Sequence, residues 1–283
     1  GIRDLVRSRG LGDVYKRQGI QILASVGEAY GTLFGTSYVR DANGNVVVDA
    51  NGLPKISTTN KTLGKFTPDW TGGISNTFSY RSLSLSFLID ASVGGSIFSN
   101  TNKTGKYTGV LANTLSGRDA EHGGLWYYTA AMGNNVRLPE SPSYSVSSDG
   151  LYYAQVNGQS TRVYQDGIMV EGVTESGSKN EEVVSAEKYY HRIYSIAEAN
   201  VYDASYVKLR EVALSYRLPR LWTQKLHLQE ASVTLTGRNL WTIYKSVPNI
   251  DPESALTTGN AQGVEAYSLP TTRSFGVNLS VKF

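Results

Sequence analysis

The stretch RSFGVNLSVKF, residues 273–283, decides the fold class that the sequence predicts. Small or polar side chains occupy every second position, and the positions between them are apolar: Phe275, Val277, Leu279, Val281 and Phe283. A period of two places successive side chains on opposite faces of an extended strand. The stretch therefore predicts a β-strand with one apolar and one polar face.

The same alternation appears earlier in the chain. Residues 74–80 and 83–89 alternate on either side of Arg81-Ser82, which predicts a hairpin with a turn of about two residues. Residues 207–218 and 233–243 also alternate, and residues 26–39 mix glycine with aromatic residues. We expect roughly six strands of about ten or more residues, a length that suits a tilted crossing of a bilayer.

One irregularity is predicted inside the segment 207–218. Val207 and Leu209 set one apolar phase, and Val212 and Leu214 set the other. A one-residue slip would move every later side chain to the opposite face of the sheet. We therefore expect a β-bulge at Arg210-Glu211.

Composition agrees with an all-β chain. The 283 residues include 19 tyrosines and 29 glycines, which are typical of strands and turns respectively. The absence of cysteine excludes disulfides and thiolate metal sites in this sequence. There is no run of about 18 apolar residues, so no transmembrane helix or signal-peptide core is predicted. This absence does not exclude membrane-crossing β-strands, because their apolar side chains occupy only every second position and form no continuous apolar run.

Residues 1–18 do not share this pattern. They hold five basic and two acidic residues, which account for the whole net charge of +3. The segment resembles translated adapter sequence more than a genuine basic periplasmic turn, and we set it apart from a domain that spans residues 19–283. Without interleaved aromatic residues or a binding motif, its arginines do not support nucleic-acid binding.

The connections between the predicted strands alternate between short and long. Arg81-Ser82 and residues 219–228 are short, whereas residues 40–69, 98–200 and 244–270 are long and polar, with a short helix expected within 181–196. A hundred-residue irregular connection argues against a compact soluble domain. It is typical of outer-membrane barrels, whose extracellular loops are long and whose periplasmic turns are short.

Two Asn-Gly pairs predict tight turns around residues 46–48, at Asn43-Gly44 and Asn51-Gly52. The same region imitates the start of a calcium loop. The imitation fails because Val46 stands where glycine is obligatory and Gly52 stands where a bidentate glutamate is needed. A hairpin is the favoured interpretation.

The fold prediction is an all-β, antiparallel transmembrane β-barrel segment with long extracellular loops. Aromatic residues near the predicted strand ends favour it, because Trp and Tyr gather at membrane interfaces. A soluble β-sandwich or β-helix is the alternative fold, because its strands also alternate apolar residues on the core face with polar residues on the other face. The interfacial candidates are Trp70, Tyr80, Trp222, Trp241, Tyr244 and Phe283.

Catalysis finds little support. His122, His191 and His227 occur singly, without metalloprotease spacing or a nucleophile elbow. Asp251 lies between Pro248 and Pro252, where a rigid turn is the simpler interpretation. We predict no catalytic, cofactor-binding or metal-binding residue. A surface adhesin or ligand-binding barrel is the more serious alternative, because long loops rich in Tyr and Asn suit recognition.

Five blocks of sequence carry a specific resemblance. They are VGEAYGTLFGTSYVRDANGNVVVDANGLP (26–54), PDWTGGISNTFSYRSLSLSFLIDASVGGSIFS (68–99), YDASYVKLREVALSYRLP (202–219), GRNLWTIYKSVPNIDPES (237–254) and PTTRSFGVNLSVKF (270–283). In this order the blocks resemble the C-terminal part of the SusC/RagA family of TonB-linked outer-membrane proteins, and the resemblance covers residues 19–283.

The resemblance implies an N-terminal plug, a 22-stranded barrel, and import of oligosaccharides or peptides with energy from the TonB complex. It also implies a SusD-like surface lipoprotein as partner and the outer membrane of a Gram-negative bacterium as location. No signal peptide, TonB box or plug precedes these strands. We therefore expect a C-terminal fragment carrying about the last six strands, without cofactors.

Two sets of residues follow as candidates. An alternating last strand that closes on phenylalanine resembles the signal read by the outer-membrane assembly machinery, with Phe283 as its key residue. Aromatic residues in the long connection could supply a platform for substrate, although loop packing is the simpler role. These are Trp126, Tyr127, Tyr128, Tyr152 and Tyr153.

Overall fold

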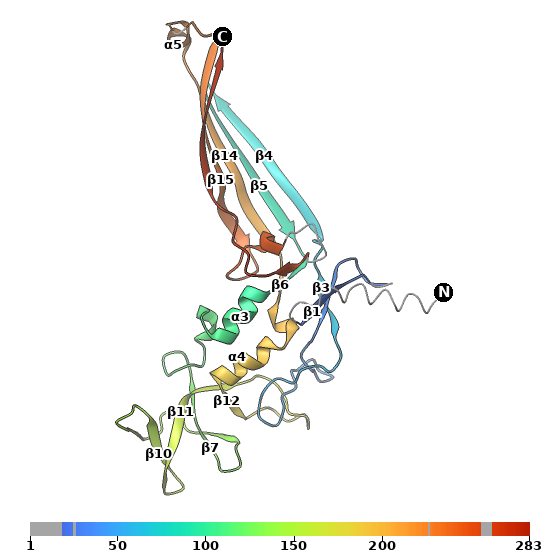
Figure 1. Ribbon diagram of the computed structural model, residues 1–283, viewed down its shortest axis with the longest axis vertical. Helices are drawn as coiled ribbons and strands as arrows, with labels where there is room; N and C mark the ends of the chain where they lie inside the picture. Colours follow the sequence, from blue (N-terminus) through green and yellow to red (C-terminus); the bar gives the residue numbers. More distant parts are fainter. Residues whose placement is uncertain (1–18, 25–26, 226, 256–261) are drawn as a thin grey trace. The chain divides into compact units, whose positions relative to one another are not determined.

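The computed structural model describes residues 19–24, 27–225, 227–255 and 262–283 (Figure 1). Strands paired in antiparallel sheets dominate these residues, so the predicted all-β, antiparallel class is confirmed. The described parts of residues 1–23, 33–63 and 99–201 form one compact unit, and those of 24–32, 64–98 and 202–283 form a second. The leader predicted at residues 1–18 lies outside the described residues.

The second unit is built on a sheet of five long strands (Figure 1). These are β4 (Trp70–Tyr80), β5 (Leu83–Val93), β14 (Tyr206–Arg217), β15 (Glu230–Lys245) and β17 (Ser274–Lys282). Their order is β17-β15-β14-β5-β4, and every neighbouring pair is antiparallel. All five come from the alternating segments, whereas residues 26–39 contribute only the short strand β2 (Thr32–Gly35).

Two local predictions about this sheet are confirmed. Tyr80 pairs with Leu83, so Arg81-Ser82 forms the tight turn, and Arg81 adopts a φ of 53° there. In β14 the register against β5 shifts between Leu209 and Glu211, which makes Arg210 the extra residue of a β-bulge.

The connection between β14 and β15 is more than the predicted turn. It contains a short helix, α5 (Arg220–Lys225), whose first turn is closed by hydrogen bonds from the Trp222 and Thr223 N–H groups to the Pro219 carbonyl. A proline just before a helix suits its start, because the missing proline N–H would have no partner there in any case. Thr223 is buried, while Leu221 and Trp222 are exposed.

The long connection between β15 and β17 is also ordered where it is described. It holds the 3-10 turn η4 (Pro252–Ala255) and the short strand β16 (Val264–Glu265). β16 joins β6 (Ser96–Ser99) and β13 (Val201–Asp203) in a small sheet of order β13-β6-β16. A hydrophobic cluster supports this region, made of Ile97, Val247, Ile250 and Ala255, with Tyr202 and Ala204 packed against it.

The first unit contains a six-stranded sheet that the sequence did not predict. Its path is β8 (Asn135–Arg137), β7 (Leu125–Thr129), β11 (Gln159–Met169), β10 (Tyr152–Val156) and β9 (Tyr144–Val146), with β12 (Val183–Ser185) paired to β11. Apart from β11, these strands have only three to five residues each. Such short strands give too few positions for a visible period of two.

Two helices accompany this sheet. α4 (Ala186–Tyr194) confirms the expected helix, although Val184 lies before it in β12 and Ile196 lies after its end. α3 (Asn100–Thr108) begins at Ser99, whose side chain accepts a hydrogen bond from the Asn102 N–H, and ends at Gly109 with φ 69°. Its sequence NTNKTGKYT lacks an apolar stripe, so the helix gave no periodic signal.

The remaining elements of the first unit are short. β1 (Ile20–Leu23), β2 and β3 (Lys61–Lys65) form a three-stranded sheet, and the 3-10 turns are η2 (Ala112–Thr114) and η3 (Ala197–Asn200). The predicted Asn-Gly turns are confirmed, since the Gly44 and Gly52 N–H groups donate to the carbonyls of Asp41 and Asp49. No helix in the described part of the chain is long and apolar enough to span a membrane.

Candidate functional site

The five-stranded sheet exposes an apolar face, and toward its hairpin turn two rows of directly opposed residues cross all five strands. One row of directly opposed residues runs Phe78, Leu85, Leu214, Leu235 and Val277, and each is at least 38% exposed. The next row toward the hairpin turn runs Tyr80, Leu83, Tyr216, Val233 and Leu279. Soluble monomers rarely expose a contiguous apolar surface of this kind, which marks an interaction site.

The opposite face of the same sheet is polar. Between the two apolar rows runs a row of Ser79, Ser84, Ser215, Thr234 and Asn278. The hydroxyls of Ser79 and Ser84 lie 3.0 Å apart, and those of Ser215 and Thr234 lie 2.8 Å apart. These small hydroxyl side chains bond to one another and make this face polar.

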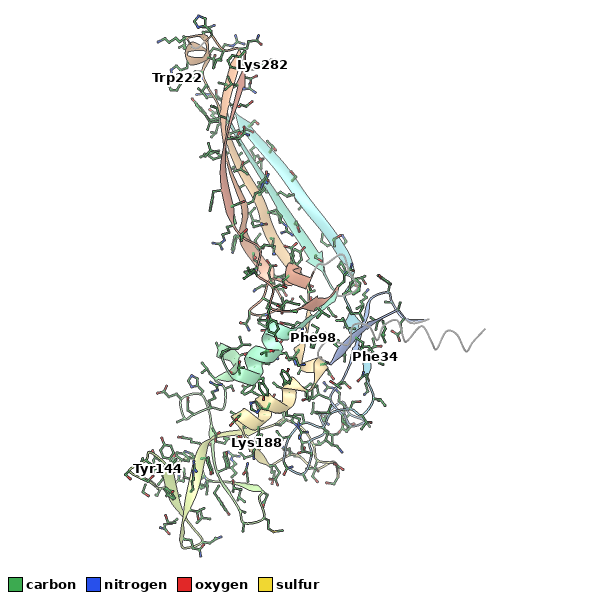
Figure 2. All side chains as sticks on the ribbon, in the orientation of Figure 1. Phe34, Phe98, Tyr144, Lys188, Trp222 and Lys282 are labelled. Carbon is green, nitrogen blue, oxygen red and sulfur yellow. The ribbon has the colours of Figure 1, made fainter. Side chains whose placement is uncertain are left out.

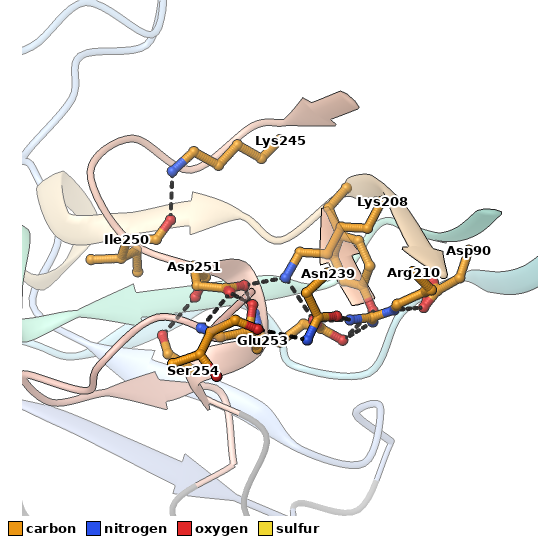
Figure 3. A network of polar contacts seen from close by, with 12 residues as sticks. Asp90, Lys208, Arg210, Asn239, Lys245, Ile250, Asp251, Glu253 and Ser254 are labelled. Carbon is orange, nitrogen blue, oxygen red and sulfur yellow. Dashed lines mark hydrogen bonds and ion pairs between the residues drawn. The ribbon is translucent and has the colours of Figure 1, made fainter. Parts of the chain in front are cut away.

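A buried ion network lies on the polar face, at the end of the sheet away from the Arg81-Ser82 turn (Figure 3). Lys208 of β14 is 2% exposed, and its Nζ lies 2.5 Å from Asp251 Oδ1 and 2.6 Å from Glu253 Oε2. Two carboxylates from the β15–β17 connection therefore converge on one buried ammonium group. A buried charge is tolerated only when it is paired and hydrogen-bonded in this way.

Arg210 extends the network along the sheet. Its guanidinium makes a two-pronged contact with Glu253, and its Nε lies 2.7 Å from Asp90 Oδ2 of β5. Asp90 is on the polar face, so the β-bulge turns Arg210 toward the same side as Glu211, its neighbour in sequence. A planar guanidinium facing a carboxylate gives strong, directional pairing.

Asp251 ties the connection to the start of β17. Its Oδ2 accepts hydrogen bonds from the backbone N–H and the hydroxyl of Thr271, at 3.1 and 2.5 Å. Burial alone would raise the pKa of Asp251, but the hydrogen bonds from Lys208 and Thr271 hold that pKa well below its usual range. Glu253 follows the same logic, with burial outweighed by Arg210 and Lys208, so its pKa is also lowered.

The sequence interpretation of Asp251 as part of a rigid turn missed this network. Pro252 does lie in the 3-10 turn η4, yet the turn also presents two carboxylates to β14. The signal available in the sequence was a pair of cations two positions apart on one strand face and a pair of carboxylates two positions apart in a connection. Nothing in either pattern says that the two pairs meet.

Exposed aromatic residues stand toward both ends of the sheet. Trp70, Trp241 and Tyr244 are 55–59% exposed toward the end with the ion network. Tyr80 and Trp222 are exposed at the other end, where α5 lies. Figure 2 shows Trp222 there, near Lys282. Phe283 follows directly after β17 and is exposed on the apolar phase, and its role as an assembly signal stays a prediction.

The predicted loop aromatics lie in the six-stranded sheet of the first unit. Trp126 is 4% exposed and packs against Ala154 and Val163. Its ring also meets those of Tyr144 and Tyr152, at centroid distances of 4.8 and 5.4 Å. Tyr144 and Tyr152 keep exposed ring surface, whereas Trp126 and Tyr127 are core residues. Tyr128 packs against the same core, and Tyr153 is half-buried opposite Arg162.

Tyr127 anchors a second polar arrangement in this sheet. Its hydroxyl donates to Asp166 Oδ1 at 3.0 Å, and its ring stacks on Tyr164. Burial and the nearby Asp166 charge raise the pKa of Tyr127 far above its usual value. A shallow hollow of about 280 Å³ lies beside these groups, lined in part by Tyr152, Arg162, Tyr164 and Asp166.

The histidines do not form a catalytic arrangement among the described residues. His122 Nδ1 lies 2.7 Å from Asp119 in an exposed loop, and the His191 ring stacks on Tyr107. No three histidine, aspartate or glutamate side chains of the described ranges gather as metal ligands.

The chain is similar to a curated TonB-dependent receptor. The chain is 25% identical over 276 residues to TonB-dependent receptor P3 of Formosa agariphila, which covers 95% of this chain and 22% of the receptor. The chain thus spans about a fifth of the length of that relative. The predicted resemblance to TonB-linked receptors is confirmed by this similarity. No protein-family model matches the chain.

Solved structures of a peptide importer are also similar. The RagAB peptide importer in the 'closed-closed' state matches with 16% identity and a TM-score of 0.46, over 95% of this chain and 24% of the other. The same importer in the 'open-open' state matches with 15% identity and a TM-score of 0.44, over 93% and 25%.

Proposed function

We propose that this chain is the C-terminal barrel segment of a TonB-dependent importer in the outer membrane of a Gram-negative bacterium. The observation that carries the proposal is the apolar face of the five-stranded sheet, on which two successive rows of opposed apolar residues cross all five strands. The similarity to TonB-dependent receptor P3 supports the class of protein.

The dimensions of the sheet suit a bilayer. Its strands have 9 to 16 residues, and about 9–11 residues cross the hydrocarbon layer in a tilted strand. In this arrangement the apolar face contacts lipid and the polar face lines the lumen. Strands β4 and β17 form the two edges of the sheet and would pair with further strands, since lipid does not tolerate an open edge.

The orientation follows from the unequal connections. Arg81-Ser82 and residues 219–228 would be periplasmic, and residues 40–69, 98–200 and 244–270 would be extracellular. The six-stranded sheet would then belong to the extracellular side. There its exposed Tyr144 and Tyr152 could contact an oligosaccharide or a peptide, and a SusD-like lipoprotein would cover the substrate. Transport of this kind needs no covalent chemistry, and none is assigned to these residues.

Cysteine labelling of intact cells tests the orientation, because the chain has no native cysteine. Met132 in the long connection 98–200 is a suitable probe position, because it is 96% exposed. A membrane-impermeant maleimide should modify Met132→Cys and should leave Gln224→Cys in α5 unmodified until the outer membrane is opened. Labelling of Gln224→Cys alone on intact cells would overturn the orientation.

Gene disruption tests transport. Loss of the full-length parent, or of TonB, should abolish uptake of the same oligosaccharide or peptide. Binding that persists at the cell surface without any TonB-dependent uptake would favour the alternative, a surface adhesin or ligand-binding barrel.

A further inference from the structure

The end of the five-stranded sheet that carries α5 combines exposed apolar and basic side chains (Figure 2). Leu221 and Trp222 of α5 are 74% and 57% exposed, and Tyr80 on the neighbouring hairpin is 71% exposed. The Arg217 N–H bonds to the Ser82 carbonyl, and the Gln229 N–H bonds to the Lys282 carbonyl, which places the three strand ends together. α5 is therefore part of one continuous surface.

The charge of this surface is strongly one-sided. Residues 79–84, 214–230 and 278–283 hold a single acidic residue, Glu230, against five cations: Arg81, Arg217, Arg220, Lys225 and Lys282. Glu230 forms an ion pair with Arg217, in which Oε1 lies 2.9 Å from the arginine Nε. The other four cations are exposed and form no ion pair within the described part of the chain. The opposite end of the sheet differs, because its buried cations are matched by carboxylates.

α5 is anchored by a buried side chain and by backbone hydrogen bonds. Thr223 is buried against the sheet, and the Leu228 N–H bonds to the Thr223 carbonyl and closes the helix end. The fixed backbone turns Leu221 and Trp222 outward together with Arg220 and Lys225, which lie in the same short helix. A rigid pairing of tryptophan with cations is the chemistry of the bilayer interface, where the ring sits at headgroup level.

We propose that α5 and the adjoining strand ends form a docking surface for anionic phospholipid headgroups. The inference rests on the proposed function, which brings this end of the sheet to the periplasmic leaflet. Leu221 and Trp222 enter the interface beside the apolar face of the sheet. Arg81, Arg220, Lys225 and Lys282 then face lipid phosphates and attract lipids of net negative charge.

The test uses the full-length parent reconstituted in phosphatidylcholine vesicles. Electron spin resonance of spin-labelled lipids measures the association of phosphatidylglycerol relative to phosphatidylcholine. Wild type should prefer phosphatidylglycerol, and Arg220→Gln/Lys225→Gln should reduce that preference by about fivefold for each cation removed at low salt. High salt should weaken the wild-type preference.

The matched control removes the same charge types elsewhere. Arg137→Gln/Lys188→Gln alters two exposed cations of the first unit and should keep the wild-type preference. An unchanged preference in the α5 variant, or an equal loss in the control, would overturn the inference. A change of oligomeric state without a change of lipid preference would assign the surface to a second copy instead, and would also overturn it.

Insertion is measured on the same samples by heat-modifiable migration on gels. Wild-type protein that inserts but shows no lipid preference refutes the lipid surface and leaves the proposed function standing. Protein that fails to insert at all refutes both. As a second readout, Trp222→Phe should reduce the share of tryptophan emission that lipids brominated near the headgroup quench, with Trp70 and Trp241 at the other end of the sheet contributing to the quenching that remains.

Discussion

The two faces of the five-stranded sheet are completed in different ways. The apolar face has regular rows of exposed side chains and no covering element in the described part of its unit. The polar face carries hydroxyl pairs and a buried ion network that receives carboxylates from the β15–β17 connection. The described residues leave the apolar face exposed, whereas on the polar face the β15–β17 connection of the same chain packs over the ion network.

The difference shows where specific structure is needed. A surface that meets lipid has to be apolar, and its side chains can vary in shape because lipid chains adapt to them. A surface that faces water and holds a loop has to fix particular atoms. Substitutions should therefore act by polarity on the apolar face and by identity on the polar face.

The largest effect is expected at Lys208. Lys208→Met leaves Asp251 and Glu253 buried without their shared cation, and breaking one side of a buried ion pair costs about 3–5 kcal/mol. Urea unfolding of the reconstituted parent should show this loss. Lys188→Met, which removes an exposed cation, serves as the control. A loss below about 1 kcal/mol would mean that the network contributes little to the fold.

A smaller effect is expected on the apolar face. Leu85→Arg or Leu279→Arg should cost about 2–4 kcal/mol if these residues face the middle of the bilayer. Their neighbours on the polar face are matched controls, so Ser84→Arg and Asn278→Arg should be tolerated much better. Folding yields in vesicles measure the difference. Equal tolerance of both pairs would remove the distinction between the faces.

Acid should loosen the polar face before the apolar one. The pKa values of Asp251 and Glu253 are lowered in the folded state, so their stabilising contribution is complete above the unfolded values of about 4. That contribution is lost as the pH falls through the lower folded values. Protease cleavage between residues 246 and 271 should therefore increase below about pH 4. Cleavage that does not change with pH would contradict ionic anchoring.

The smallest effect is expected for the hydroxyl pairs. Ser215→Ala and Thr234→Val each remove one partner of a bond that contributes about 0.5–1.5 kcal/mol. The double variant should lose less than the sum of the two single variants, since each single change leaves the other hydroxyl without its partner. A double-mutant cycle in urea measures the coupling. If the losses in unfolding free energy of the two single variants add exactly, the 2.8 Å contact between Ser215 and Thr234 contributes nothing to stability.

Sequence reasoning reached the five long strands because each repeats its apolar residues often enough to show a period of two. It also reached the bulge at Arg210, since the apolar phase visibly changes there. These features are local, and local patterns are written in consecutive residues.

The features that the sequence did not predict are contacts between residues far apart in the chain and strands of only a few residues. The pairing of Lys208 with Asp251 joins residues 43 positions apart, and no pattern in either segment fixes that encounter. The six-stranded sheet consists mostly of strands too short to show alternation. Trp126 was a candidate for substrate contact by residue type, yet its burial depends on Tyr144 and Val163, which lie elsewhere in the sequence.

The extra residue at the bulge bears on how β14 tolerates change. If Arg210 were deleted, Val207, Leu209, Val212, Leu214 and Tyr216 would fall into one uninterrupted alternation. The pattern of apolar residues thus has no need of the insertion, and the gain lies on the polar face, where Arg210 pairs with Asp90 and Glu253. A single added codon can in this way equip one surface of a strand with a new anchor while its opposite surface stays as it was. Relatives of this chain that lack the insertion should also lack a carboxylate at the position of Asp90, whose ion-pair partner is Arg210, and a comparison of their sequences would reveal this.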